Sequence, residues 1–261
     1  MSAAMLNVVG LQMDVVWENR TANYATAHRL LAACAPAENS LVVLPETFPT
    51  GFSLNPDIVV EPNDGPTLDF LRKLAAEFRV CVVGGAFRRD QAGRPRNQAL
   101  VVAPNGNLLA EYSKMQPSWV GGEGRVVEAG IAPVVFEWQG ATIAPYVCYD
   151  LRFPEVFRTA AVQWQPQLYL VLGNWAPARM HHWRRLLVAR AIENQAFFVG
   201  INRVGSDPNA TYTGESLVVD FHGEILAELK DGEGLLRSSI DLNALASYRK
   251  QLPFLADMKR G

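Results

Sequence analysis

The sequence predicts an α/β protein built as a four-layer α-β-β-α sandwich, in which two packed sheets are covered by helices. About twelve strand-like segments occur with only a few helices between pairs of them, which is too strand-rich for one doubly wound sheet. Several of these strands are apolar throughout, as expected for strands that are buried on both faces. A chain of 261 residues with 49% hydrophobic residues is long enough to form such a core.

The elements of the first half are predicted from spacing and turn residues. Helices are expected over 19–35 and 64–78, where apolar residues recur at helical spacing. Asn105-Gly106 predicts a tight hairpin turn between strands at 97–103 and 108–112. Further strands are expected at 6–12, 41–45 and 80–87, and residues 115–130 are expected to form a long irregular loop.

The second half continues the pattern. Gln139-Gly140 predicts a second hairpin, helices are expected over 154–163 and 179–195, and Asp241 is expected to cap a last short helix before a tail at 251–261. The helix over 179–195 carries an apolar face that includes Ile192, and its Arg190 and Glu193 are spaced to pair. Strands are expected at 134–138, 141–147, 167–172, 197–202, 216–221, 224–229 and 234–240.

Composition limits the classes of partner and location. No repeat or linker interrupts the chain, so residues 1–261 are expected to form one domain. The 24 basic and 26 acidic residues are evenly distributed, which argues against nucleic-acid and membrane partners. Residues 1–5 lack the pattern of a secretory signal, and no apolar run approaches the ~18 residues of a membrane span. Three cysteines without repeated spacing favour a reducing compartment, so we expect a cytoplasmic protein.

Cys148 stands where an apolar strand ends and a charged turn begins. A thiol at this junction lies at the open end of a sheet, and the amides of the following helix start are expected to favour its thiolate form. Cys148 is therefore a candidate nucleophile. Cys34 lies in an Ala-rich helix end and Cys81 in an apolar strand, so both are expected to be core residues.

Two further charged residues follow predicted strands. Glu46 comes directly after the buried strand 41–45, and open α/β sheets place their chemistry outside the carboxyl ends of strands. A helix-capping or solvated acid is the alternative for Glu46. Lys114 follows the strand at 108–112, and taken alone it fits a solvated surface lysine.

Three motifs in this order resemble the nitrilase superfamily of carbon–nitrogen hydrolases. They are LPE at 44–46, YSK at 112–114 and VCYDLRFPE at 147–155, and the segments GNW at 173–175 and ARAIENQ at 189–195 support them. Within the superfamily the chain is most similar to the ω-amidase branch, which includes bacterial enzymes that hydrolyse 2-oxoglutaramate. CYD also resembles the amidases, whereas true nitrilases more often carry CWE.

The resemblance implies a Glu-Lys-Cys triad and a thioester intermediate. Glu46 would take the proton of Cys148, while Lys114 and the backbone N–H of Tyr149 would stabilise the oxyanion. Glu123 matches the second glutamate of the family and would orient Lys114 or position the attacking water. The resemblance implies no cofactor, and the four histidines show no metal-ligand pattern.

The substrate implied by the branch is the ω-monoamide of a small dicarboxylic acid. Arg152 would offer a planar fork to the distal carboxylate, or would brace its own turn by pairing with Asp150 or Glu155. Relatives often continue the lysine as KxHLF, whereas this chain has KMQPSW at 114–119, so the loop is expected to close differently. The other expected substrate-binding residues are Phe52, Asn174 and Trp175, of which Phe52 and Trp175 would form an apolar wall.

Other interpretations remain open at this point. A thiol hydrolase would use His181 or His182 as the base, and a redox sensor would use Cys148 without turnover. Another amidase, a carbamoylase or a nitrilase of the same superfamily would act on a different small substrate. The resemblance also suggests a homodimer or a larger homo-oligomer, to which Leu252, Phe254 and Leu255 in the tail would contribute.

Overall fold

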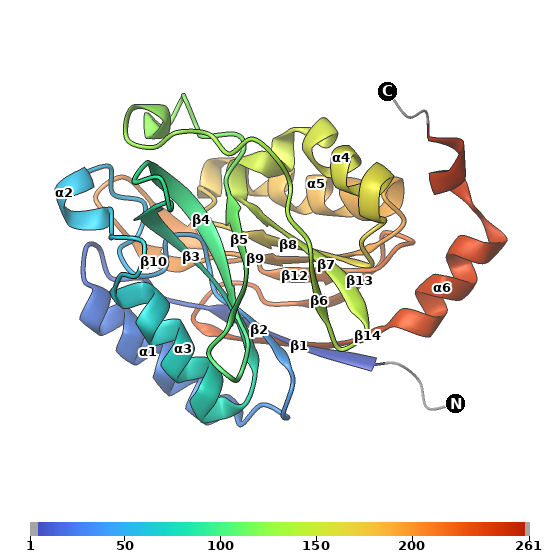
Figure 1. The fold of residues 1–261 in the computed structure, drawn as a ribbon, viewed down its shortest axis with the longest axis horizontal. Helices are drawn as coiled ribbons and strands as arrows, with labels where there is room; N and C mark the ends of the chain where they lie inside the picture. Colours follow the sequence, from blue (N-terminus) through green and yellow to red (C-terminus); the bar gives the residue numbers. More distant parts are fainter. Residues whose placement is uncertain (1–4, 259–261) are drawn as a thin grey trace.

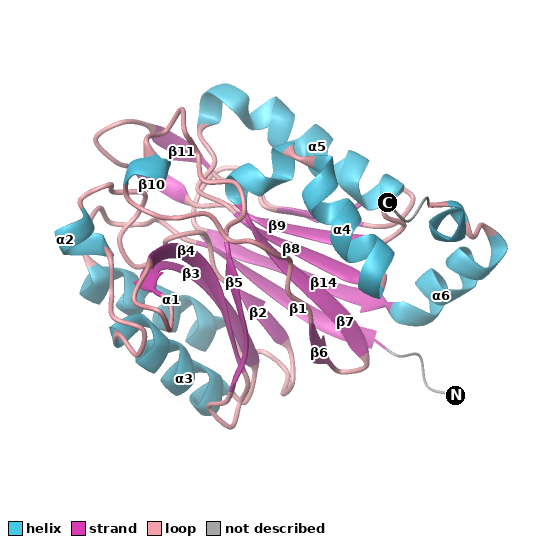
Figure 2. Ribbon diagram, turned by 45° about the horizontal axis from the view of Figure 1, so that its top comes forward, coloured by secondary structure: helices cyan, strands magenta, loops and turns pink. Residues whose placement is uncertain are grey.

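Two six-stranded sheets pack face to face, and helices cover their outer faces, as Figure 1 and Figure 2 show from two sides. The predicted four-layer α-β-β-α sandwich is therefore confirmed. This computed structural model describes residues 5–258. Residues 1–4 and 259–261, which hold most of the N-terminal segment and the end of the expected tail, lie outside the described part.

The first sheet joins both ends of the chain. In spatial order it contains β14 (Gly234–Asp241), β1 (Met5–Gln12), β2 (Leu41–Val43), β3 (Cys81–Arg89), β4 (Pro95–Val102) and β5 (Leu108–Ser113). β1, β2 and β3 run parallel, and the other pairs are antiparallel. The turn between β4 and β5 is the predicted one, since Gly106 has φ +82° and Asn105 Oδ1 accepts a hydrogen bond from the N–H of Asn107 at 3.0 Å.

The second sheet comes from the second half of the chain. In spatial order it contains β13 (Ile225–Glu228), β12 (Leu217–Val219), β9 (Phe197–Ile201), β8 (Leu168–Leu172), β7 (Ala141–Val147) and β6 (Phe136–Trp138). β7, β8 and β9 run parallel. A separate hairpin of β10 (Val204–Ser206) and β11 (Thr211–Thr213) follows β9.

Each sheet has its own pair of helices (Figure 1). The first sheet carries α1 (Arg20–Cys34) and α3 (Pro66–Phe78), and the second carries α4 (Pro154–Trp164) and α5 (Met180–Glu193). Asp241 Oδ1 accepts from the N–H groups of Asn243 and Ala244, so it is the predicted N-cap of α6 (Leu242–Gln251). No helix within 5–258 has both the length and the apolar character to cross a bilayer.

Alternation along β2 explains why its sequence is apolar throughout. Leu41 and Val43 belong to the core cluster that also contains residues of the second sheet. Val42 and Leu44 belong to the cluster beneath α1 and α3. Both faces of the strand are therefore buried, as predicted for a sheet between two layers.

Several local predictions were wrong. The short helix α2 (Pro56–Val59) and the β10–β11 hairpin were not predicted, and the tail contains a 3-10 turn (Phe254–Asp257). Ile192 was placed on the apolar face of its helix, but it is 47% exposed. Arg190 pairs with Glu193 at 3.1 Å as predicted. The pair was expected on the helix surface, but Arg190 is buried and also donates to the carbonyl oxygen of Leu151 at 3.0 Å.

Candidate active site

The three charged or nucleophilic residues predicted at strand ends come together between the sheets. Glu46 lies just beyond β2, Lys114 directly follows β5, and Cys148 directly follows β7. The first two belong to one sheet and the third to the other. The site therefore lies at the seam where the two sheets pack, and all three side chains are at least nine-tenths buried.

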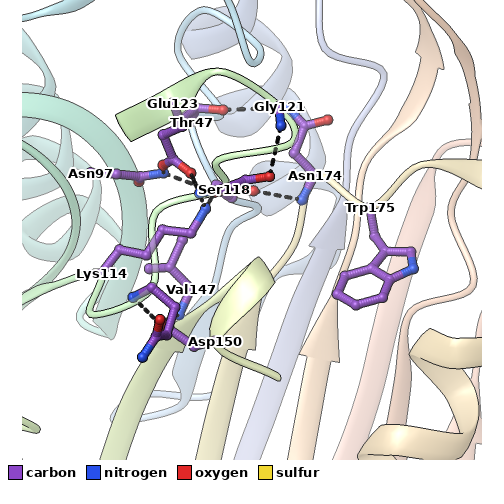
Figure 3. Close-up of polar contacts among 12 residues, drawn as sticks. Thr47, Asn97, Lys114, Ser118, Gly121, Glu123, Val147, Asp150, Asn174 and Trp175 are labelled. Carbon is purple, nitrogen blue, oxygen red and sulfur yellow. Dashed lines mark hydrogen bonds and ion pairs between the residues drawn. The ribbon is translucent and has the colours of Figure 1, made fainter. Parts of the chain in front are cut away.

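Lys114 is buried between two carboxylates (Figure 3). Its Nζ donates to Oε1 of Glu46 and to Oε2 of Glu123, each at 2.8 Å. Burial lowers the pKa of Lys114, but the charges of Glu123 and Glu46 outweigh it and raise that pKa above its ordinary value. Lys114 is therefore a fixed cation in the site.

Asn97 links the two glutamates and was missed in the sequence. Its Nδ2 donates to Oε1 of Glu46 at 2.8 Å and to Oε1 of Glu123 at 2.7 Å. The backbone N–H of Ser118 donates to Oε2 of Glu123 at 2.7 Å. Both oxygens of Glu123 are thus occupied by protein donors. A polar residue inside the otherwise buried strand β4 was the available signal.

Cys148 has a backbone conformation that is unusual for a residue with a side chain. Its φ is +44°, in the left-handed region, and it begins the 3-10 turn Cys148–Arg152. Thr47, directly after Glu46, also has φ +44°. Such conformations cost of order 1–3 kcal/mol and cluster at active sites, where the surrounding structure holds them in place.

Within residues 5–258, the groups that face the Cys148 thiol are the carboxyl of Glu46, the ammonium of Lys114 and the backbone amide of Asn174. Burial and the carboxylate of Glu46 raise the pKa of Cys148 well above its ordinary value. Both effects oppose the help that the following turn was expected to give in holding a thiolate. His182, a candidate base of the alternative Cys-His hypothesis, has its Nδ1 3.2 Å from Nη1 of Arg152.

The carboxyl group of Glu46 is itself prepared for proton transfer. Burial raises its pKa, and the nearby Glu123 adds to this effect, which outweighs the opposite effect of Lys114. One oxygen is held by Lys114 and Asn97, and the other accepts from the backbone N–H of Asn174 at 3.1 Å. A base with a raised pKa beside a protonated thiol is suited to accept that proton.

Gly85 lies so close to the backbone of Glu46 that a side chain at this position would displace the glutamate. A Cβ at Gly85 would lie 2.8 Å from Cα of Glu46, so Gly85→Ala must shift the glutamate. We expect a loss of about 10²-fold in kcat, because a displacement near 1 Å has this cost. Gly84→Ala is the matched control, since its Cβ would meet only the side chains of Leu71 and Phe48. Equal kcat values in the two variants, with melting temperatures measured alongside, would contradict this account.

Arg152 lies beside the site without an acidic partner. Its guanidinium carbon is 4.5 Å from the centre of the Trp175 ring and 5.7 Å from that of Tyr149. Among the described residues it pairs with neither Asp150 nor Glu155, so the bracing alternative in its predicted form is wrong.

The other predicted substrate-binding residues surround the cluster. The ring centre of the half-buried Phe52 lies 5.5 Å from Lys114 Nζ. Nδ2 of Asn174 donates to Oγ1 of Thr47 at 3.4 Å, and its buried Oδ1 has no partner within residues 5–258. Trp175 is held by two hydrogen bonds of 2.8 Å. Its ring Nε1 donates to the carbonyl oxygen of Arg179, and its backbone N–H donates to Oδ1 of Asn202.

Asp150 joins the nucleophile turn to the lysine strand and was not predicted as a site residue. Its Oδ2 accepts from the hydroxyl of Tyr112 at 2.8 Å and from the N–H of Val147 at 3.0 Å, and its Oδ1 accepts from the N–H of Gln116 at 2.9 Å. Burial raises the pKa of Asp150 to about 7, against these donors and the charge of Lys114. The carboxylate ties together the two segments that carry Cys148 and Lys114.

A metal would find no ready ligand set here. Within the described part of the chain, no three His, Cys, Asp or Glu side chains are grouped to hold a metal ion. The chemistry of the cluster is that of a thiol, a base and fixed hydrogen-bond donors, which is the set required for acyl transfer. The fold and the geometry of the site together match a hydrolase of the α-β-β-α type.

Comparisons with known proteins extend this result. The family model described as carbon-nitrogen hydrolase matches residues 7–250. The omega-amidase YafV of Yersinia enterocolitica is 37% identical, over 97% of this chain and 96% of its own length. The 2-oxoglutaramate amidase of Bacillus subtilis is 30% identical over 96% of each chain. XC1258 from Xanthomonas campestris, a CN-hydrolase superfamily protein whose crystal structure has an arsenic adduct in the active site, superposes with a TM-score of 0.92 at 35% identity over 98% of each chain.

The chain belongs to the carbon–nitrogen hydrolase family, and it is a hydrolase that acts on carbon–nitrogen bonds. The resemblance to the nitrilase superfamily and to its ω-amidase branch is thereby confirmed.

Proposed function

We propose that this protein hydrolyses a small carboxamide to the carboxylic acid and ammonia through a thioester on Cys148. The observation that carries the proposal is the buried cluster of Glu46, Lys114 and Glu123 beside the thiol of Cys148. A thiol needs a base to become nucleophilic, and the carbonyl it attacks needs donors for the oxyanion. The cluster contains both.

The first half-reaction forms the thioester. Glu46 takes the proton from Cys148, and the thiolate sulfur attacks the amide carbon to give a tetrahedral oxyanion. Lys114 Nζ and the backbone N–H of Tyr149 stabilise that oxyanion. As the oxyanion collapses, the C–N bond breaks, Glu46 gives its proton to the leaving nitrogen, and ammonia departs.

The second half-reaction releases the acid. Glu46, again without its proton, takes one from water, and the hydroxide attacks the thioester carbon. The C–S bond breaks and the sulfur recovers the proton from Glu46. We assign Glu123 to orienting Lys114, because protein donors occupy both of its oxygens.

We propose that the substrate is the ω-monoamide of a small dicarboxylic acid, such as 2-oxoglutaramate. The names of the relatives support this class, and so does the free guanidinium of Arg152 four residues after the nucleophile. Phe52 and Trp175 would form the apolar wall, and Asn174 Oδ1 is free to accept an N–H of the carboxamide.

Replacing Arg152 tests the substrate class. Arg152→Lys removes the planar fork, so we expect kcat/KM for 2-oxoglutaramate to fall about 10-fold or more, with a smaller loss for a neutral amide of equal length. Ammonia release from matched amides and nitriles measures both values, and nitriles are expected to be poor substrates. If the wild-type protein hydrolysed the acidic and neutral amides at equal rates, the ω-amidase assignment would fail while the amidase mechanism remained.

We also propose a cytoplasmic location and a homo-oligomer. Three free, buried cysteines support a reducing compartment. Leu252 and Phe254 are 43% and 53% exposed and remain candidates for a subunit contact, whereas Leu255 is buried within its own chain. Light scattering of Phe254→Asp alongside the wild-type protein tests the contact, and an unchanged mass would remove Phe254 from it.

A further inference from the structure

Arg152 ends the nucleophile turn (Cys148–Arg152) and contacts helix α5 through the side chain of His182. This contact determines which nitrogen of the His182 ring carries the proton. Arg152 Nη1 lies 3.2 Å from Nδ1 of His182. A guanidinium only donates hydrogen bonds, so Nδ1 must be the acceptor. His182 is therefore neutral in this contact and carries its proton on Nε2.

The surroundings of His182 favour that neutral form. The charged and titratable groups that face it are Arg152 from the turn, Arg179 from the segment before α5, and His181 and Arg185 from α5 itself. Burial and these charges lower the pKa of His182 below its ordinary value. Within residues 5–258, none of the three arginines has an ion pair. The patch is therefore an uncompensated positive surface.

The elements that hold Arg152 are fixed to one another. Trp175 packs against the guanidinium at 4.5 Å, and the Trp175 ring is anchored through its Nε1 to Arg179. Helix α5 is tied to the nucleophile turn by Arg190, which donates to the carbonyl of Leu151 at 3.0 Å. His182 and Trp175 thus restrict the guanidinium from two sides, which lowers the entropy cost of binding an anion.

We infer that His182 is a positioning residue that holds Arg152 ready for the distal carboxylate of the substrate. The inference rests on the proposed function, because it assumes an acid-bearing amide, and it adds a specificity determinant to it. Trp175 stacks on the guanidinium, His182 accepts one of its N–H groups, and the remaining N–H groups can bind the carboxylate. Arg179 and Arg185 add attraction for a negatively charged ligand.

Binding of 2-oxoglutarate, the acid that 2-oxoglutaramate would yield, tests the inference without turnover. We expect calorimetry on the intact protein to show a dissociation constant about tenfold weaker in His182→Ala, the loss of one hydrogen bond to a charged group. His182→Asn should recover most of the affinity, since its Oδ1 can accept near the position of Nδ1. His181→Ala is the matched control, because His181 is exposed and packs on His182 without contacting Arg152.

The pH dependence separates positioning from a structural role. Protonation of Nδ1 abolishes the acceptor, so wild-type affinity should fall as the pH falls through the lowered pKa of His182, while the asparagine variant should lack this transition. The ratio of kcat/KM for 2-oxoglutaramate to that for a neutral amide should drop with the affinity. Absence of 2-oxoglutarate binding to the wild-type protein, or equal affinity in His182→Ala, would overturn the inference. Ammonia release from neutral amides would still support the hydrolase mechanism in that case.

Discussion

Replacement of Cys148 by alanine is expected to abolish ammonia release from every amide substrate. The Cys148 thiol faces both Glu46 and Lys114, and without it no thioester can form. Cys148→Ser should retain almost no activity, because a hydroxyl is a far weaker nucleophile beside a carboxylate base. Rates are compared as kcat under saturating amide, and a Cys148→Ala protein with more than a few per cent of wild-type kcat would contradict the assignment.

The thioester itself can be observed. Rapid-quench intact-mass measurement should show the acyl group on the wild-type protein and no acyl group on Cys148→Ala. Cys34→Ala is the control, since Cys34 is a buried thiol at the end of α1 and far from the cluster in the fold. Chelators should leave activity unchanged, and activity lost to a chelator and restored by zinc would refute a metal-independent mechanism.

Lys114→Met is expected to damage both catalysis and stability. The variant loses an oxyanion donor, which typically costs about 10²–10³ in kcat. It also leaves Glu46 and Glu123 buried without their cation, and breaking such a pair costs roughly 3–5 kcal/mol of unfolding free energy. Urea denaturation measures the second effect. Lys73→Met on the exposed surface of α3 is the control and should change neither quantity.

A second substitution and the pH dependence of stability show whether Lys114→Met is destabilised by uncompensated charge or by lost packing. Lys114→Met combined with Glu123→Gln should recover part of the stability but no activity, because one buried charge is removed and the donor is still absent. Lys114 lowers the pKa of Glu46, which burial already raises, so without the lysine this pKa rises further. The folded state is then favoured at low pH and loses stability as the pH rises through the raised pKa of Glu46. The deficit should therefore be larger at pH 7.5 than at pH 5. A deficit independent of pH would indicate lost packing instead.

The three predicted residues that the structure brings together share one property. Glu46, Lys114 and Cys148 each stand where an apolar strand ends, and alternation and turn residues locate strand ends well. Asn105-Gly106 fixed one hairpin and Asp241 one helix start for the same reason, since their effects are local. The resemblance then supplied roles that spacing alone did not.

The residues that were missed act across long sequence distances. Asn97 matters because two glutamates from other segments converge on its amide. His182 was considered only as a base, and its contact with Arg152 was not predicted because that arginine comes from another element. Such partners are chosen by tertiary packing, which leaves no periodic signal. Ile192 was misplaced for a related reason, because Arg190 occupies the buried side of that helix end to reach the nucleophile turn.

The division of the site between the two sheets has a consequence for the newly made chain. An N-terminal fragment that ends before β7 contains the base, the lysine and the second glutamate, but it has no nucleophile, and the later half has the thiol without a base. Catalytic reactivity therefore arises only after the two halves have joined. Enzyme activity should accordingly be the last property gained on refolding and the first lost in mild denaturant.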